Sequence, residues 1–149
     1  MRRRPRRIGL VGCVSQKRAN AAPAEKLYIS TLFDGRRRFV ERTCDDWYVL
    51  SALHGLVHRA TVLEPYDVAL TGQGRDAKRR WADCVLRQIE RVVPKMKSVT
   101  FEIHAGADYF DFGLSAGLER RGAQVVIPTR GLRVGEQLRF YRSQPEPRR

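Results

Sequence analysis

Only three of the 149 residues are cysteines, and Cys13, Cys44 and Cys84 have neither a CxxC spacing nor a histidine-paired one. An odd number of cysteines without such spacing indicates reduced thiols in a cytoplasmic protein and argues against a zinc site. The sequence has no apolar run of transmembrane length. Its basic N-terminus, MRRRPRRIGL, does not lead into the cleavage site of a secretory signal. We therefore expect a cytoplasmic protein that needs no metal or cofactor and enters no membrane.

Common phosphate-binding motifs are missing as well. Gly9 and Gly12 do not complete a GxGxxG pattern, and no GxxxxGK followed by Ser or Thr occurs. These absences argue against a dinucleotide fold and against a phosphate loop. No serine, histidine and aspartate set can be recognised either, so serine-protease-like chemistry is not indicated.

Acidic residues are scarce. The 16 Asp and Glu residues stand against 29 Lys and Arg residues, which gives a net charge of +13. An excess of this size is informative about partners, and it favours a polyanion, nucleic acid above all. A membrane surface is the weaker alternative, because no helix pairs a basic face with an exposed apolar face. We expect a monomer that binds DNA, duplex or single-stranded.

The apolar residues, 42% of the chain, suffice for the core of one domain. We place this domain at residues 8–143, between a basic arm at 1–7 and a tail at 144–149. Four short apolar runs read as buried strands. They are Ile8–Cys13, Trp47–Ala52, Val99–Ala105 and Gln124–Pro128.

Helical patterns separate these strands. Ser30 is a suitable cap for a helix that turns Arg36, Arg37 and Arg38 mostly outward. A second helix covers residues 76–93, with Cys84 at an apolar position. A third runs from Asp108 to Arg121 before Gly122, and a fourth from Val134 to Arg142. Alternating helices and apolar strands predict a three-layer α/β/α domain around a four-stranded parallel sheet.

Ligands of such sheets bind beyond the carboxyl ends of the strands. One segment in that position is LEPYDVAL, residues 63–70, within a long connection from His54 to Gly74 that reads as neither helix nor clean strand. Glu64 and Asp67 flank a Pro-Tyr pair there. As catalytic residues, they would activate water or stabilise a cationic transition state. The alternative is structural, with Asp67 capping a turn and Glu64 pairing with an arginine.

The other strand ends carry further candidates. Four residues are suited to hydrogen bonding with a base edge, namely Ser15, Gln16, His54 and Gln137. The Tyr66 ring is suited to stacking on a base. Lys17 and Arg18 are suited to phosphate, and so are Arg130 and Arg133, which precede the last helix. For each, a structural role is the alternative. His104 also ends a strand, and a lone histidine there is more often structural.

Six segments of the chain resemble an uncharacterised domain family of bacteria and phages. They are LVGCVSQKR, APAEKLYISTLF, WYVLSALHGLV, LEPYDVAL, HAGADYF and GLRVGEQL. The family pattern contains LYxSxLF, WYxLSAxxGL, an EPYD element and a late GxGxQ. The resemblance extends from Ile8 to Phe140. More distantly, the family is similar to peroxide-stress YaaA-like proteins and to a domain of archaeosine synthases.

This resemblance implies a uracil-DNA-glycosylase-like fold. The chain departs from true uracil-DNA glycosylases, because Ser15-Gln16-Lys17 stands where they have a GQDPYH-like motif, and PTRGLRVG replaces their histidine-serine-proline motif. Three functions follow as expectations. The first is a DNA glycosylase that flips a damaged or modified base and uses Asp67 or Glu64. The second is a nucleic-acid-binding stress or defence protein without catalysis. The third is an N-glycosidase or transglycosidase on free nucleosides or nucleotides, which the high charge disfavours.

Overall fold

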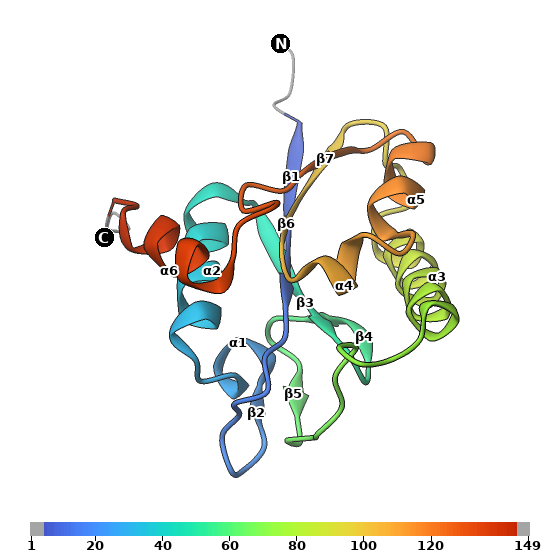
Figure 1. Cartoon of the computed structure of the whole chain (residues 1–149). Helices are drawn as coiled ribbons and strands as arrows, with labels where there is room; N and C mark the ends of the chain where they lie inside the picture. The colour runs from blue at the N-terminus through green and yellow to red at the C-terminus, as the bar shows by residue number, and fades with distance from the viewer. Residues whose placement is uncertain (1–4, 146–149) are drawn as a thin grey trace.

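The computed structural model describes residues 5–145, which form a five-stranded sheet between two layers of helices (Figure 1). The strand order is β4-β3-β1-β6-β7. Four of the strands run parallel: β1 (Arg6–Gly12), β3 (Asp46–Ser51), β6 (Val99–His104) and β7 (Gln124–Val126). These strands coincide with the four predicted apolar runs. Every residue of β6 is buried, as expected for a parallel strand covered on both faces.

The prediction of a purely parallel, four-stranded sheet was wrong at one edge. β4 (Gly55–His58) pairs antiparallel with β3. It lies in the segment that the sequence indicated to be irregular, where β5 (Val62–Leu63) also pairs with β2 (Ala22–Pro23) in a small second sheet. A four-residue strand, here Gly-Leu-Val-His, is too short for its pattern to be recognised from the sequence.

The helices cover both faces of the sheet. Figure 1 shows α2 (Thr31–Thr43) and α6 (Val134–Arg142) on one face, and α3 (Arg75–Val92) and α5 (Leu114–Arg120) on the other. The predicted cap of α2 is confirmed, since the Ser30 hydroxyl accepts a hydrogen bond from the Phe33 amide at 3.0 Å. The predicted apolar position of Cys84 in α3 is wrong, because this residue is exposed.

The helix predicted from Asp108 to Arg121 is divided in two. Its first part is α4 (Ala107–Phe110), and α5 follows after an interruption at Gly113. Gly113 has a φ of 126°, which no helix allows and which glycine tolerates best. Gly122 ends α5 with a φ of 93°, as expected for a glycine after a helix.

The ends of the chain differ slightly from the prediction. β1 begins at Arg6, so Arg6 and Arg7 of the expected basic arm pair with β6 in the sheet. Residues 1–4 of the arm and 146–149 of the tail lie outside the described residues. Between residues 5 and 145, no helix has the length and apolar character needed to cross a membrane.

Candidate functional site

The topology singles out the carboxyl ends of β1 and β6. From β1 the chain continues to α2 on one face of the sheet, and from β6 it continues to α5 on the opposite face (Figure 1). In open α/β sheets, ligands bind where neighbouring strands diverge in this way. The two strand ends lie very close together, since a Cβ at Gly12 would be 2.7 Å from the Cβ of Ala105.

Tyr66 is held at this end of the sheet by two hydrogen bonds. Its hydroxyl lies 2.7 Å from the Ser51 hydroxyl, at the last residue of β3, and 2.6 Å from the Tyr28 hydroxyl. Ser51 also accepts a hydrogen bond from the His54 amide at 3.0 Å. Burial raises the pKa of Tyr28 to about 12, and it raises the pKa of Tyr66 as well. Both phenols therefore stay protonated at neutral pH, and the Tyr66 ring can act as a fixed platform.

Two of the predicted site residues surround the Tyr66 ring. The Lys17 ammonium lies 4.5 Å from the ring centroid. The exposed His54 ring meets it edge-on, with 5.4 Å between the centroids. Ser15 and Gln16 are exposed in the loop that leads from β1 to Lys17. Arg18, next along the loop, is exposed and donates to the Lys26 carbonyl. The structure thus brings a cation, an imidazole and a phenol ring together.

The two predicted catalytic acids lie on the surface. Glu64 and Asp67 are both exposed, on either side of the half-buried Tyr66 in the sequence. Within residues 5–145, neither carboxylate has a hydrogen-bond or ion-pair partner. Both are therefore available to an incoming group.

A second polar cluster, which we call the buried network, connects β1, β6 and α6. Glu102 and His104 have no exposed surface. The Glu102 carboxylate lies 2.6 Å from Arg7 Nε and 2.7 Å from His104 Nε2, and it also accepts a hydrogen bond from Thr43. The Tyr141 hydroxyl lies 2.6 Å from the other ring nitrogen of His104.

The protonation states in the buried network follow from its contacts. Burial raises the pKa of Glu102, but the hydrogen bonds from His104 and Arg7 outweigh it and leave the pKa below the ordinary value. Burial lowers the pKa of His104. Glu102 is thus ionised and His104 neutral, so His104 Nε2–H donates to Glu102 and Tyr141 O–H donates to His104 Nδ1. The buried network anchors α6 to the sheet.

Arg36 and Gln137 join the buried network to the end of β1. The prediction that Arg36 faces outward was wrong, because only 4% of its surface is exposed. It donates to the Gln137 side chain at 3.2 Å and to the Gly12 carbonyl at 3.4 Å. Gln137 in turn donates to the Leu132 carbonyl. The oxygen and the nitrogen of the Gln137 amide therefore both have partners within the protein. This disfavours the role in reading a base that was predicted from the sequence.

One family model matches residues 8–143 of the chain, and its description is a family of unknown function, DUF6884. The chain belongs to this family. The match contains β3, the Tyr66 platform and all of the buried network apart from Arg7. No curated protein and no solved structure matches the chain.

Arg130 and Arg133 lie near the start of α6 but have different surroundings. Arg130 is 3.4 Å from Asp111 and packs over the Phe110 ring at 5.0 Å. Arg133 is exposed, and its amide donates to the Glu136 carboxylate at 3.0 Å. A carboxylate already occupies this helix N-terminus, which disfavours the predicted binding of an anion there.

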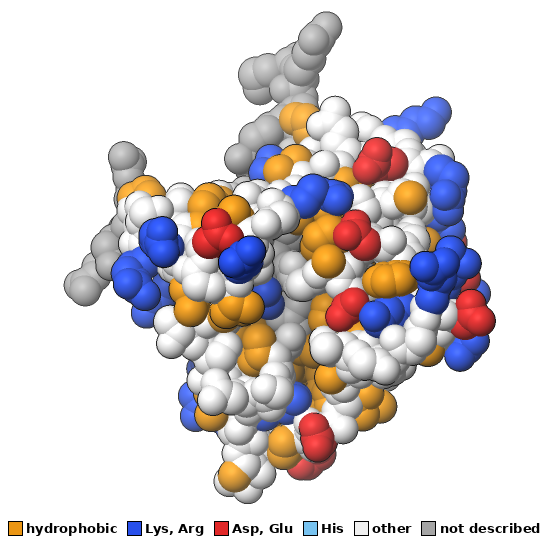
Figure 2. All heavy atoms as spheres, viewed as in Figure 1, with side chains coloured by type: hydrophobic (Ala, Val, Ile, Leu, Met, Phe, Trp, Pro, Cys, Tyr) orange, Lys and Arg blue, Asp and Glu red, His pale blue; other side chains and the backbone are white. Residues whose placement is uncertain are grey.

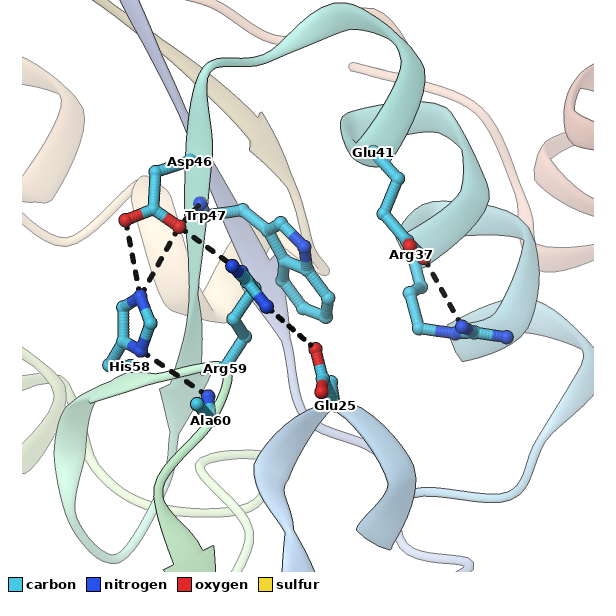
Figure 3. Close-up of polar contacts among 8 residues, drawn as sticks. All are labelled: Glu25, Arg37, Glu41, Asp46, Trp47, His58, Arg59 and Ala60. Carbon is cyan, nitrogen blue, oxygen red and sulfur yellow. Dashed lines mark hydrogen bonds and ion pairs between the residues drawn. The ribbon is translucent and has the colours of Figure 1, made fainter. Parts of the chain in front are cut away.

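A third cluster lies at the opposite end of β3 and includes His58, which sequence reasoning overlooked. Figure 3 shows Asp46 between His58 and Arg59, with Arg59 also reaching Glu25. His58 Nε2 is 3.1 Å from Asp46, and its Nδ1 accepts from the Ala60 amide at 3.3 Å. Both ring nitrogens are engaged, so this pair is structural and not a free acid–base couple. In the described part of the chain, no three His, Cys, Asp or Glu residues are grouped to hold a metal ion.

Proposed function

We propose that this protein is a DNA base glycosylase with a uracil-DNA-glycosylase-like fold, distantly related to YaaA-like proteins and to archaeosine synthases. Its mostly parallel sheet, with β1 in the centre, is compatible with that fold. A net charge of +13 supports DNA as the substrate, because a free nucleoside would not need it.

One observation carries the proposal. The Tyr66 ring is fixed at the carboxyl end of β3, beside Lys17, and the adjoining acids have no partner within residues 5–145. A flipped base needs a stacking surface, and base–aromatic stacking contributes about 1–3 kcal/mol. Ser15, Gln16 and His54 would supply hydrogen bonds to its edge. Lys17 and Arg18 would contact the flanking phosphates, and Arg130 and Arg133 more distant ones.

The proposed chemistry needs one ionised carboxylate. The C1′–N bond breaks with its electron pair leaving on the base, and positive charge develops on the sugar. Asp67, helped by Glu64, stabilises that charge and accepts a proton from the water that adds to C1′. The buried network takes no direct part and holds the end of β1 in place through Arg36.

The experiment that tests the proposal is a base-release assay. DNAs with unmodified, damaged and hypermodified bases are incubated with the protein, abasic sites are cut with alkali, and released bases are identified by mass spectrometry. We expect Asp67→Asn to lower turnover by about two orders of magnitude or more and to leave DNA binding intact. Glu64→Gln is the matched control, with the smaller loss expected.

Thermal melting separates this role from a structural one. Asp67 has no intramolecular partner among the described residues, so Asp67→Asn should not lower the melting temperature. If its activity fell only in proportion to unfolded protein, Asp67 would have a structural role.

The second candidate function is nucleic-acid binding without catalysis. The exposure of both acids favours it, because a carboxylate in water stabilises a nearby cation weakly. If the wild type releases no base from any DNA tested, this second function replaces the first.

A further inference from the structure

The outer surface of α3 carries three arginines on one ridge. Arg80, Arg87 and Arg91 recur at intervals of seven and four residues, which places them on one side of a helix. All three are exposed, and they lie opposite the buried stripe of Ala82, Val85, Leu86 and Ile89. We call them the α3 ridge. Figure 2 shows Lys and Arg side chains along the flank where Figure 1 places α3 and α5.

The charges of the α3 ridge are not neutralised by any of the residues that the structure describes. None of its arginines forms an ion pair among residues 5–145. By contrast, Arg37 and Arg59 are engaged with carboxylates, as is Arg121. A cation without an ion pair can neutralise a phosphate directly and so release a counterion condensed on the DNA, whereas a paired cation must first lose its carboxylate. The exposed acids of the same helix are Asp76, Asp83 and Glu90, and among residues 5–145 only Glu90 has an ion-pair partner, Arg121.

A basic groove adjoins the end of the α3 ridge. The chain after α3 forms a groove of about 670 Å³ whose walls include Arg6, Lys95 and Lys97 together with Val93 and Pro94. These three cations also have no acidic partner in the described residues. Five of these cations, unpaired among residues 5–145, thus lie on α3 and the loop that follows it, and the sixth, Arg6, lies beside them at the start of β1.

The part of α3 between Trp81 and Gln88 is fastened to the Tyr66 platform and to the turn beside it. Trp81 Nε1 donates to the Ser51 carbonyl at 2.9 Å, and Ser51 holds the Tyr66 hydroxyl. Gln88 binds the turn between β3 and β4 and contacts the His54 carbonyl at 3.1 Å. A strand whose base lies at Tyr66 can therefore continue along α3.

We infer that the α3 ridge and the basic groove bind the sugar-phosphate backbone of DNA on one side of the base held at Tyr66. The inference rests on the proposed function for its choice of ligand. The α3 ridge, from Arg80 to Arg91, extends about 17 Å. At 3.4 Å per nucleotide along a duplex strand, this length corresponds to about five nucleotides. The binding footprint is therefore asymmetric about the target base.

Two pairs of substitutions test the surface. Arg87→Gln with Arg91→Gln removes two charges from the α3 ridge. Arg139→Gln with Arg142→Gln removes from α6 two exposed charges that have no ion-pair partner in the described part of the chain. Fluorescence anisotropy with DNA duplexes should show the slope of log affinity against log salt falling by about two for the α3 pair. We expect little change for the α6 pair. Equal effects of the two pairs would overturn the inference.

Two further variants refine the test. Asp83→Asn should tighten binding, because it removes a negative charge beside the ridge. Lengthening the duplex on one side of the target base should raise affinity up to about five nucleotides, and lengthening it on the other side should not. A symmetric length dependence would contradict the asymmetric footprint.

Cys84 allows the contact to be located directly. It is exposed within α3, whereas Cys13 is buried and Cys44 partly buried. A photo-cross-linker on Cys84 should attach to DNA on one side of the target base. The control carries the label at Ser143, directly after α6, through Ser143→Cys in a Cys84→Ser background. Equal cross-linking from both positions would refute the inference.

Failure of the inference can be distinguished from failure of the proposed function. If the α3 pair of substitutions left both base release and DNA binding unchanged, the inference about the α3 surface would be wrong and the proposed glycosylase function would stand. If DNA binding depended on the α3 arginines but no base were released, the α3 surface would be supported and the proposed glycosylase function would be wrong. Stronger binding of RNA than of DNA, with the same dependence on α3, would overturn DNA as the ligand.

Discussion

Replacing Glu102 with glutamine would remove a negative charge from a side chain with no exposed surface. The carboxylate contacts Arg7, Thr43 and His104, and an amide cannot accept hydrogen bonds from all three. Breaking a buried ion pair costs about 3–5 kcal/mol, and because Arg7 is partly exposed we expect about 3 kcal/mol. For a chain of this size, that lowers the melting temperature by roughly 6–12 °C. Thermal unfolding followed by circular dichroism measures the difference.

The same substitution should change how stability depends on pH. The pKa of Glu102 is lowered in the folded state, so its stabilisation is complete above its ordinary value of 4.5 and is lost as the pH falls further. The pKa of His104 is lowered too, so protonation of the unfolded chain destabilises the fold below about 6.5. Glu102→Gln should therefore reduce the loss of stability near pH 4.

Glu41→Gln is the control for this prediction. Glu41 is exposed and pairs with Arg37 at 3.2 Å on the surface of α2, and such pairs contribute about 0.3–0.5 kcal/mol. If Glu102→Gln melted at the same temperature as Glu41→Gln, the buried network would not anchor α6 as argued.

Other substitutions test the packing at the candidate site. Tyr66→Phe removes the hydroxyl between Tyr28 and Ser51 and should cost about 1–3 kcal/mol in urea unfolding, with base release per folded molecule preserved. Wild-type stability of this variant would show that the platform is not held by its hydroxyl. Gly12→Ala forces a Cβ against β6 and should destabilise the protein by about 1–3 kcal/mol. Gly135→Ala meets open space within a helix and should instead stabilise it by about 0.5–1 kcal/mol.

The amino-acid sequence alone determined the elements that depend on local patterns. The four parallel strands follow from runs rich in apolar and branched residues, such as Ile8–Cys13, because a parallel strand covered on both faces has few positions for polar side chains. The cap at Ser30 and the end of α5 at Gly122 follow from the chemistry of single residues. The position of the candidate site at the strand ends followed from the alternation of strands and helices alone.

Only the tertiary structure decided which side chains meet. Tyr66 touches Ser51 and Tyr28, which are 15 and 38 positions away in the chain, and no local pattern encodes such contacts. Arg36 was expected among exposed arginines, but its guanidinium lies under α6, where Nη1 and Nη2 donate to the end of β1 and to Gln137 while the buried Nε has no partner among the described residues. The local pattern of apolar residues shows which face of a helix or strand is buried. Which polar side chains are buried with that face depends on contacts between segments that are distant in the sequence. For this reason the strand ends could be predicted from the sequence, whereas the Tyr66 platform and the buried network could not.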